Sequence, residues 1–350
     1  MKSIFIPRYF WNGTNDEVCT NTAVLVRDNR IEQIDEPEKL RLGYPEAQVL
    51  ESNDWLMMPA FVDAHDHGRG MSPISFRTPD RALEMWLQDL NKLPAIPHYQ
   101  ACYYDGMRLV SSGVGMVLHS HNPNSFAQIR EEMVAAEKGY KDAGIRSILC
   151  PLYLDQNKRI YYDRDKFISD LPEPLRTNFA AGIHDKIMNM DEYFQLVEGI
   201  CEDLADDIKA GWTEVQLHPN GGQWCSDEAL LQMKEYALEH GMYIHLHLLE
   251  TQYQAEYAKR TWGKSFIKHY KEIGFLGPWV SFAHAVWLDE EDLQLIAESG
   301  AHLITNPSSN LRLRSGIFNM QRANELGIDC GIGLDGCAFD DDQDYLREIR

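Results

Sequence analysis

With 350 residues, of which 44% are hydrophobic and 11% aromatic, the chain is long enough to bury one large core, with or without a small appended domain. Its 54 acidic and 33 basic residues give a formal charge of −21, which argues against nucleic acid or an anionic membrane as a partner. The seven cysteines include no C-x-x-C pair, which predicts reduced thiols in a cytoplasmic protein. The chain soon becomes polar after its start, which predicts no signal peptide, and no apolar run approaches the ~20 residues of a membrane span.

Residues 1–56 have the pattern of a small β domain. Short apolar, β-branched or alternating segments are separated by turn residues such as Asp28 and Asn29. The predicted strands are residues 2–6, 22–26 and 30–34. A β unit of this size is not stable alone, so we expect it to pack with strands from elsewhere in the chain.

From residue 57 onwards, apolar segments of strand length alternate with amphipathic segments of helix length. The predicted strands are residues 56–62, 115–119, 146–152, 214–217, 243–247, 280–284, 301–305 and 329–334. The predicted helices include residues 126–143, 191–209, 227–240, 256–270 and 289–299. This alternation implies a parallel sheet, and eight such units fit a (β/α)8 barrel, with a doubly wound open sheet as the alternative.

Polar side chains stand where four of these predicted strands end, which is where a barrel carries its active site. They are His65, His67, His247, His284 and Asp335, with Glu250 three residues after His247. Each of them alone is more often a hydrogen-bonded core residue or a turn residue. Together, the histidines and the aspartate of strands one, five and eight predict a mononuclear zinc-type site with one position open for water.

Several motifs together resemble the amidohydrolase superfamily, and most closely its branch of aminohydrolases and triazine chlorohydrolases, which includes S-adenosylhomocysteine, guanine and cytosine deaminases. The motifs are PAFVDAHDH at 59–67, HLLET at 247–251, His284 followed by Trp287-Leu288, NPSSNL at 306–311 and GLDG at 333–336. The resemblance covers nearly the whole chain, since residues 23–31 resemble the β-sandwich half that precedes these barrels. It implies that the metal ligands are His65, His67, His247 and Asp335.

The resemblance also implies a domain organisation: residues 1–56 form part of a β-sandwich, and residues 57–350 form the barrel. The family normally completes its sandwich with strands after the barrel, whereas this chain ends at Arg350, within what should be the eighth helix. We therefore expect a sequence cut within its last helix. Bimetallic members carry a carboxylated lysine on strand four, and residues 214–218 contain none. This indicates one divalent metal ion, with Zn²⁺ favoured over Fe²⁺ or Mn²⁺.

The activity implied by these residues is a metal-dependent deamination. Zn²⁺ lowers the pKa of its water toward ~7, so that metal-bound hydroxide can attack an amino-substituted sp² carbon of a purine, pyrimidine, pterin or triazine-like heterocycle and release ammonia. Glu250 would act as general acid and base, His284 would orient the hydroxide and stabilise the developing charge, and Asp335 would also hold the water's proton. The alternatives are a related hydrolase that releases chloride, an alkylamine or a cyclic amide nitrogen, and a metal-free scaffold protein.

Weaker signals concern the small-molecule substrate. The predicted substrate contacts, each with a structural role as the alternative, are Arg69, Glu84, Trp86, His121 and His218. His245 is expected to face the helix layer, away from His247. Homo-oligomer formation is left open.

Overall fold

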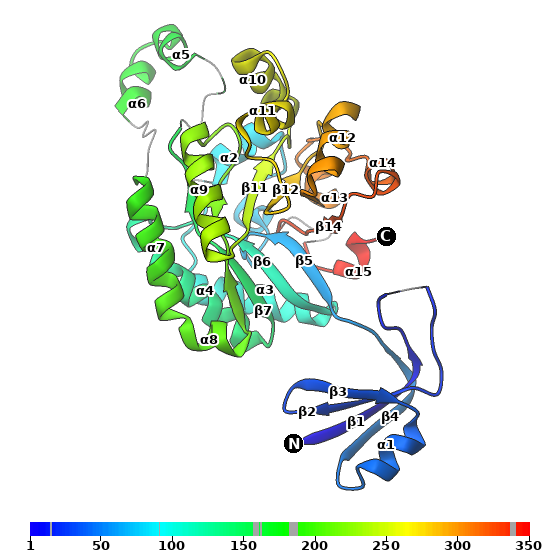
Figure 1. The fold of residues 1–350 in the computed structure, drawn as a ribbon. Coiled ribbons are helices and arrows are strands. Elements are labelled where there is room, and N and C mark those ends of the chain that lie inside the picture. Colours follow the sequence, from blue (N-terminus) through cyan, green and yellow to red (C-terminus); the bar gives the residue numbers. More distant parts are fainter. Residues whose placement is uncertain (15, 91, 157–160, 162, 182–187, 337–340) are drawn as a thin grey trace. The chain divides into compact units, whose positions relative to one another are not determined.

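The computed structural model describes residues 1–14, 16–90, 92–156, 161, 163–181, 188–336 and 341–350. The chain divides into two compact units, Met1–Ala60 and Phe61–Arg350 (Figure 1). No helix in the described parts of the chain has the length and apolar character needed to cross a membrane. The cysteines of these parts are free thiols.

The N-terminal unit is a mixed four-stranded sheet with one helix. Its elements are β1 (Lys2–Phe10), β2 (Ala23–Arg27), β3 (Arg30–Asp35), α1 (Pro37–Gly43) and β4 (Gln48–Met57). The strand order is β3-β2-β1-β4, with β2 antiparallel to both neighbours and β4 parallel to β1. Asp28 and Asn29 form the β2–β3 turn with φ values of 47° and 64°, as a two-residue hairpin of this type requires. The small core consists of Ile4, Ile6, Ala23, Leu25 and Leu40.

The stretch predicted as the first barrel strand, residues 56–62, is divided between the two units. Its first residues belong to β4, which ends at Met57, and the barrel strand β5 begins only at Phe61. Pro59 lies between them and has no N–H for a strand ladder, which explains the interruption. The predicted strand was therefore placed several residues too early.

The second unit is the predicted barrel of parallel strands. One sheet is formed by β5 (Phe61–Asp66), β6 (Val114–Ser120), β7 (Arg146–Cys150) and β9 (Thr213–Val215). The other is formed by β11 (Ile244–Leu248), β12 (Val280–His284), β13 (His302–Thr305) and β14 (Cys330–Ile332). The short strands β8 (Leu152–Tyr153) and β10 (His218–Pro219) pair with each other.

Two contacts close these sheets into a ring. Leu217 forms a parallel bridge with Ile244, which joins the end of β9 to β11. On the other side, the Asp335 N–H donates to the His65 carbonyl over 2.9 Å, which joins the residues after β14 to β5. The predicted barrel is confirmed, and the open sheet is excluded.

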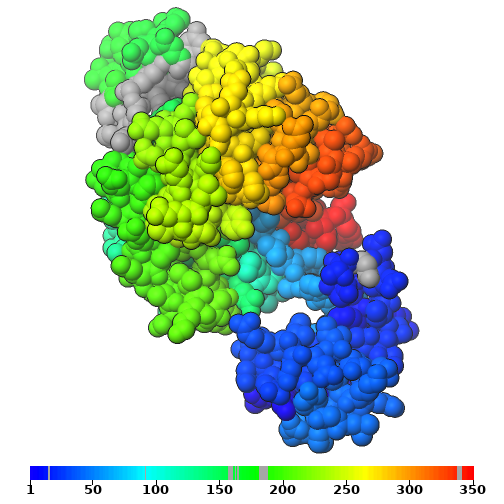
Figure 2. All heavy atoms as spheres, in the orientation of Figure 1, coloured from blue at the N-terminus to red at the C-terminus, as the bar shows by residue number. Residues whose placement is uncertain are grey.

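Helices surround the strands (Figure 1). They are η1 (Pro73–Phe76), α2 (Leu83–Leu90), α3 (His98–Ser111), η2 (Phe126–Gln128), α4 (Ile129–Ala143), α5 (Arg164–Asp170), α6 (Leu175–Ala181), α7 (Met190–Asp203), α8 (Ala205–Ala210), α9 (Asp227–His240), α10 (Gln252–Trp262), α11 (Phe266–Ile273), α12 (Glu290–Ser299), α13 (Pro307–Arg312), α14 (Met320–Glu325) and α15 (Tyr345–Glu348). In the space-filling view, α9 to α12 (yellow-green to orange) cover one side of this unit (Figure 2). Leu246 and Phe282 lie fully buried beneath such helices, because both faces of these strands are covered.

Candidate metal centre

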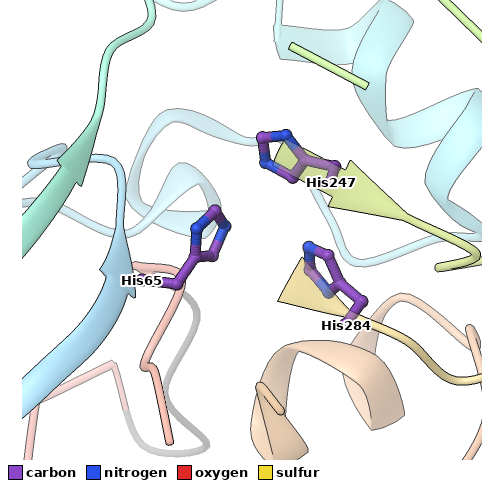
Figure 3. A group of neighbouring side chains, drawn as sticks. All are labelled: His65, His247 and His284. Atoms are coloured by element: carbon purple, nitrogen blue, oxygen red, sulfur yellow. The ribbon is translucent and has the colours of Figure 1, made fainter. Parts of the chain in front are cut away.

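Five of the side chains singled out in the sequence meet at the C-terminal ends of the barrel strands. His65 lies in β5 and His67 directly follows it, His247 lies in β11, His284 ends β12 and Asp335 follows β14. The imidazoles of His65, His247 and His284 point toward one common space (Figure 3). All five side chains are buried.

The donor atoms of four of these residues have the spacing of a metal site. Asp335 Oδ1 lies 3.0 Å from His67 Nε2 and 3.4 Å from His65 Nε2. His247 Nε2 lies 3.4 Å from His67 Nε2. Ligands on a tetrahedral zinc ion at ~2.0–2.1 Å are about 3.3 Å apart. Within the part of the chain that the structure describes, His65 Nε2 is buried without a hydrogen-bond partner, and a bound cation would supply one.

The outer nitrogens of these histidines have protein partners that orient the rings. His67 Nδ1 lies 2.7 Å from the Ser120 carbonyl oxygen, and His247 Nδ1 lies 2.6 Å from the Asn220 carbonyl oxygen. Each Nδ1 therefore carries its proton toward a carbonyl, and each Nε2 is left with a lone pair for the ion. Metal-binding histidines are commonly oriented in this way.

His65 is oriented by another histidine. Its Nδ1 lies 2.8 Å from His245 Nε2, and His245 Nδ1 lies 2.7 Å from Ser281 Oγ. The expectation that His245 faces the helix layer is therefore wrong. Residues two apart in a strand point to the same face, so His245 and His247 both face the barrel interior.

The protonation states suit metal binding. Burial lowers the pKa of His65 to about 3 and that of His67 to about 4, so both rings are neutral at pH 7. Burial opposes the ionisation of Asp335, but its contacts with the His65 and His67 rings hold its pKa well below the usual value. Neutral imidazoles and a carboxylate are the forms that coordinate a cation.

Glu250 lies beside this group in a position for proton transfer. Its Oε2 is 3.7 Å from His284 Nε2, and the residue is only 3% exposed. Burial raises the pKa of Glu250 to about 7, while the neighbouring His284 opposes this rise. A carboxyl group with a pKa near the working pH can both accept and donate a proton.

The segment after β13 positions two of the central side chains. Asn310 Oδ1 accepts from His284 Nδ1 over 2.9 Å, so His284 Nε2 faces the centre as an acceptor. Ser309 Oγ donates to the second carboxylate oxygen, Oδ2, of Asp335. The NPSSN run stands out in the sequence, but its role is not visible there, because the residues that Ser309 and Asn310 contact follow or end other strands.

The backbone is strained at the same place. Leu249, His284, Ala285 and Asp335 have φ values of 50°, 71°, 50° and 57°. Side-chain-bearing residues rarely adopt positive φ, and such residues cluster at functional sites, where the surrounding structure must hold them. The strain here lies at the ends of β11, β12 and β14.

A cavity of about 510 Å³ opens onto the centre. Most of its lining is apolar, and His67, His247, Glu250, His284 and Asp335 form part of it. Arg69 and Trp86 also line the cavity, with the guanidinium 5.2 Å from the ring centroid. A mostly apolar pocket with few polar groups is typical of a small-molecule site.

The other predicted substrate contacts lie behind this lining. Glu84 Oε1 accepts from Thr251 Oγ1 over 2.6 Å. His218 is fully buried, with its ring nitrogens 2.8 Å from Ser120 Oγ and 2.6 Å from the His245 carbonyl oxygen. His121 is fully buried as well, within a group of histidines that is described below. Contact of these three residues with substrate stays a prediction.

Comparison with known proteins identifies relatives of the whole chain. The model of the amidohydrolase family matches residues 56–350. A 5'-deoxyadenosine deaminase of Methanosarcina barkeri is 26% identical over 335 residues, which are 94% of this chain and 68% of that protein. A 5-methylthioadenosine/S-adenosylhomocysteine deaminase of Thermococcus onnurineus is 27% identical over 350 residues, 98% of this chain and 72% of that protein. The crystal structure of an adenosine deaminase from Xanthomonas campestris with bound zinc superposes with a TM-score of 0.78 at 20% identity, and the match covers 99% of this chain and 72% of that one.

Proposed function

The chain belongs to the amidohydrolase family, and on this basis we propose that it is a zinc-dependent aminohydrolase that removes the amino group of an adenine-type purine nucleoside. The observation that carries the proposal is the position of Glu250. Its carboxyl group, with a pKa of about 7, stands beside His284 and lines the same cavity as His67, His247 and Asp335. Proton transfer and metal binding are thereby combined at one point.

His65, His67, His247 and Asp335 would hold the ion through Nε2 atoms and Oδ1. A Zn²⁺ ion at this position lowers the pKa of a water molecule toward ~7 and so supplies a nucleophile at neutral pH. Four protein ligands, and no lysine in residues 214–218, favour a single catalytic ion. Anomalous scattering from zinc-saturated crystals should show one peak between these side chains, and two peaks about 4 Å apart would contradict this.

The remaining steps are assigned to the chain's own residues. Glu250 accepts a proton from the attacking water and delivers it to a ring nitrogen beside the attacked carbon. His284 Nε2, left as an acceptor because Nδ1 faces Asn310, orients that water. Attack on the amino-bearing carbon forms a tetrahedral intermediate that carries the added hydroxyl group. Glu250 then takes the proton of that hydroxyl group and delivers it to the amino group, so that the C–N bond breaks, ammonia leaves and the carbonyl forms. Water and the aminopurine thus give ammonia and the oxopurine.

The size and lining of the cavity favour a purine nucleoside. About 510 Å³ lies in the usual range for a small-molecule site. Leu83, Trp86 and Leu313 offer apolar surface to a flat base, and Arg69 offers a donor to an oxygen of the substrate. Both relatives described above are named for deamination of adenosine derivatives.

A substrate screen tests this proposal. Zinc-loaded enzyme is incubated with aminopurine nucleosides, aminopyrimidines, aminopterins and triazines, and released ammonia is measured. We expect the highest kcat/KM with an adenine nucleoside. Release of chloride or alkylamine from a triazine, without ammonia from any aminopurine, would replace the proposal by the related hydrolase with another leaving group.

A further inference from the structure

A second group of histidines lies outside the metal centre, behind one wall of the cavity. His98 begins α3, His119 lies at the end of β6 and His121 follows that strand. Each residue offers one ring nitrogen, and these three nitrogens lie within 4.8 Å of one another. His119 and His121 are fully buried, and the His98 side chain is 10% exposed.

The partners of these rings orient their nitrogens toward each other. His119 Nδ1 lies 3.1 Å from the Tyr140 hydroxyl, and His121 Nε2 lies 3.1 Å from Glu132 Oε2. The remaining nitrogens, His119 Nε2 and His121 Nδ1, are 3.0 Å apart. In both His119 and His121, one ring nitrogen therefore faces an oxygen atom and the other faces the neighbouring imidazole. Metal-binding histidines commonly have this arrangement.

His98 and Glu132 complete this group. Among the described residues no hydrogen-bond partner is found for the buried His98 Nε2, which lies 3.3 Å from Glu132 Oε2. Glu132 is itself held by the backbone N–H groups of Asn124 and Ser125, at 3.1 Å and 3.0 Å. One fixed carboxylate therefore faces two of the three imidazoles.

We propose that His98, His119 and His121 bind a divalent transition-metal ion that is separate from the catalytic ion. Three imidazoles suit Zn²⁺, Cu²⁺ or Ni²⁺ rather than Mg²⁺ or Ca²⁺, which prefer oxygen ligands. Glu132 holds His121 from behind and lies beside His98 Nε2. Because His98 lines the cavity, the ion has an entry path and its fourth position can be taken by water.

The protonation of the group agrees with this role. Burial lowers the pKa of His119 and of His121 well below the usual value, and the neighbouring histidines lower it further. Burial also lowers the pKa of His98, against the opposing effect of Glu132. Imidazoles that stay neutral at pH 7 have no proton to lose before they bind a metal.

The close packing around Gly68 ties this group to the catalytic centre. A Cβ atom at Gly68, where φ is 60°, would lie 2.5 Å from the Tyr140 hydroxyl and 2.6 Å from His119 Nδ1. Only a glycine therefore fits directly after the catalytic ligand His67. An ion on the second group would hold α3, β6 and the cavity wall together beside that ligand.

The test locates and counts the ions in the full chain. Protein stripped with a chelator is reloaded with Zn²⁺, loosely bound metal is removed, and zinc is counted by mass spectrometry. We expect two ions per chain, and a zinc anomalous peak between the three imidazoles in addition to the catalytic peak. The double variant His98→Gln/His121→Gln should retain one ion, whereas the control variant His240→Gln, a histidine at the end of α9, should retain two.

The result that overturns the proposal is also specific. At saturating zinc, absence of an anomalous peak between the imidazoles of the wild-type crystal would show that the group is only a hydrogen-bonded relay. Two ions in the double variant would overturn it equally. The wild-type crystal needs no substitution, so poor folding of a variant does not prevent a decision. The single variant His98→Gln, at the cavity wall, should bind the second ion at least tenfold more weakly.

Discussion

His245 Nε2 lies 2.8 Å from His65 Nδ1, so a neutral histidine supports this ligand of the metal centre. When His65 binds an ion through Nε2, its Nδ1 carries the proton and donates to His245. His245 Nδ1–H then donates to Ser281 Oγ over 2.7 Å, which leaves each proton in one defined place. A metal-binding histidine more often donates to a carboxylate or a carbonyl oxygen. Because His245 does not face the cavity, it acts as a positioning residue.

Removal of the acceptor at His245 should weaken metal binding without a change in fold. In His245→Leu the His65 Nδ1–H is left buried without a partner, and we expect a 10- to 100-fold loss of zinc affinity at the catalytic centre. His245→Gln places an amide oxygen near the same point and should restore most of the affinity. Chelator competition with the two variants measures this. Equal affinities of the Leu variant and wild type would refute the role.

Glu250→Gln should separate proton transfer from metal binding. The amide keeps the shape of the side chain but cannot shuttle a proton, so turnover should fall by ~10²–10⁴-fold. Zinc content should stay at the wild-type value, since Glu250 is outside the ligand set. Turnover and zinc content are measured on the same preparation. Near-normal turnover on the best substrate, or loss of zinc, would exclude the assigned role.

Asp335→Asn should behave differently, because it changes a ligand that also contacts two histidines. The neutral amide removes the charge that faces His65 and His67 at 3.4 Å and 3.0 Å. We expect loss of the catalytic zinc together with turnover. Ser309→Ala, which removes only the hydrogen bond to Oδ2, provides the matched control and should have a smaller effect on both. A variant Asp335→Asn that keeps its catalytic zinc peak would contradict the ligand assignment.

The sequence could predict the barrel, and it could predict that the histidines and Asp335 lie close together, because these residues stand at the ends of predicted parallel strands. Apolar segments are visible in the sequence, and parallel strands bring their C-terminal ends together. Contacts between segments far apart could not be predicted in this way. The hydrogen bond between His284 and Asn310 forms only through tertiary packing. The same is true of the approach of His98 to His121. Two local features account for the two wrong predictions. Pro59 has no N–H and interrupts the predicted first strand, and the period of two along β11 places His245 on the same face as His247.

A buried carboxyl group that is not part of the metal centre should make stability depend on pH. Glu137 on α4 is 3% exposed, and in the described parts of the chain its Oε1 has no hydrogen-bond partner. Burial, and then the nearby Asp207, raise the pKa of Glu137 from 4.5 to about 7, while Lys141 opposes this rise.

Because this pKa is higher in the folded state than in the unfolded state, the stabilising contribution is fully present below pH ~4.5 and is lost as the pH rises through about 7. The loss in the free energy of unfolding is at most about 3–4 kcal/mol, at about 1.4 kcal/mol for each pKa unit. Glu137→Gln should therefore be more stable than wild type at pH 8 and differ little from it at pH 5. Urea unfolding at both pH values measures this difference, and Glu131→Gln, an exposed residue of the same helix, serves as the control. A difference between Glu137→Gln and wild type that does not change with pH would show that Glu137 ionises normally in the folded protein.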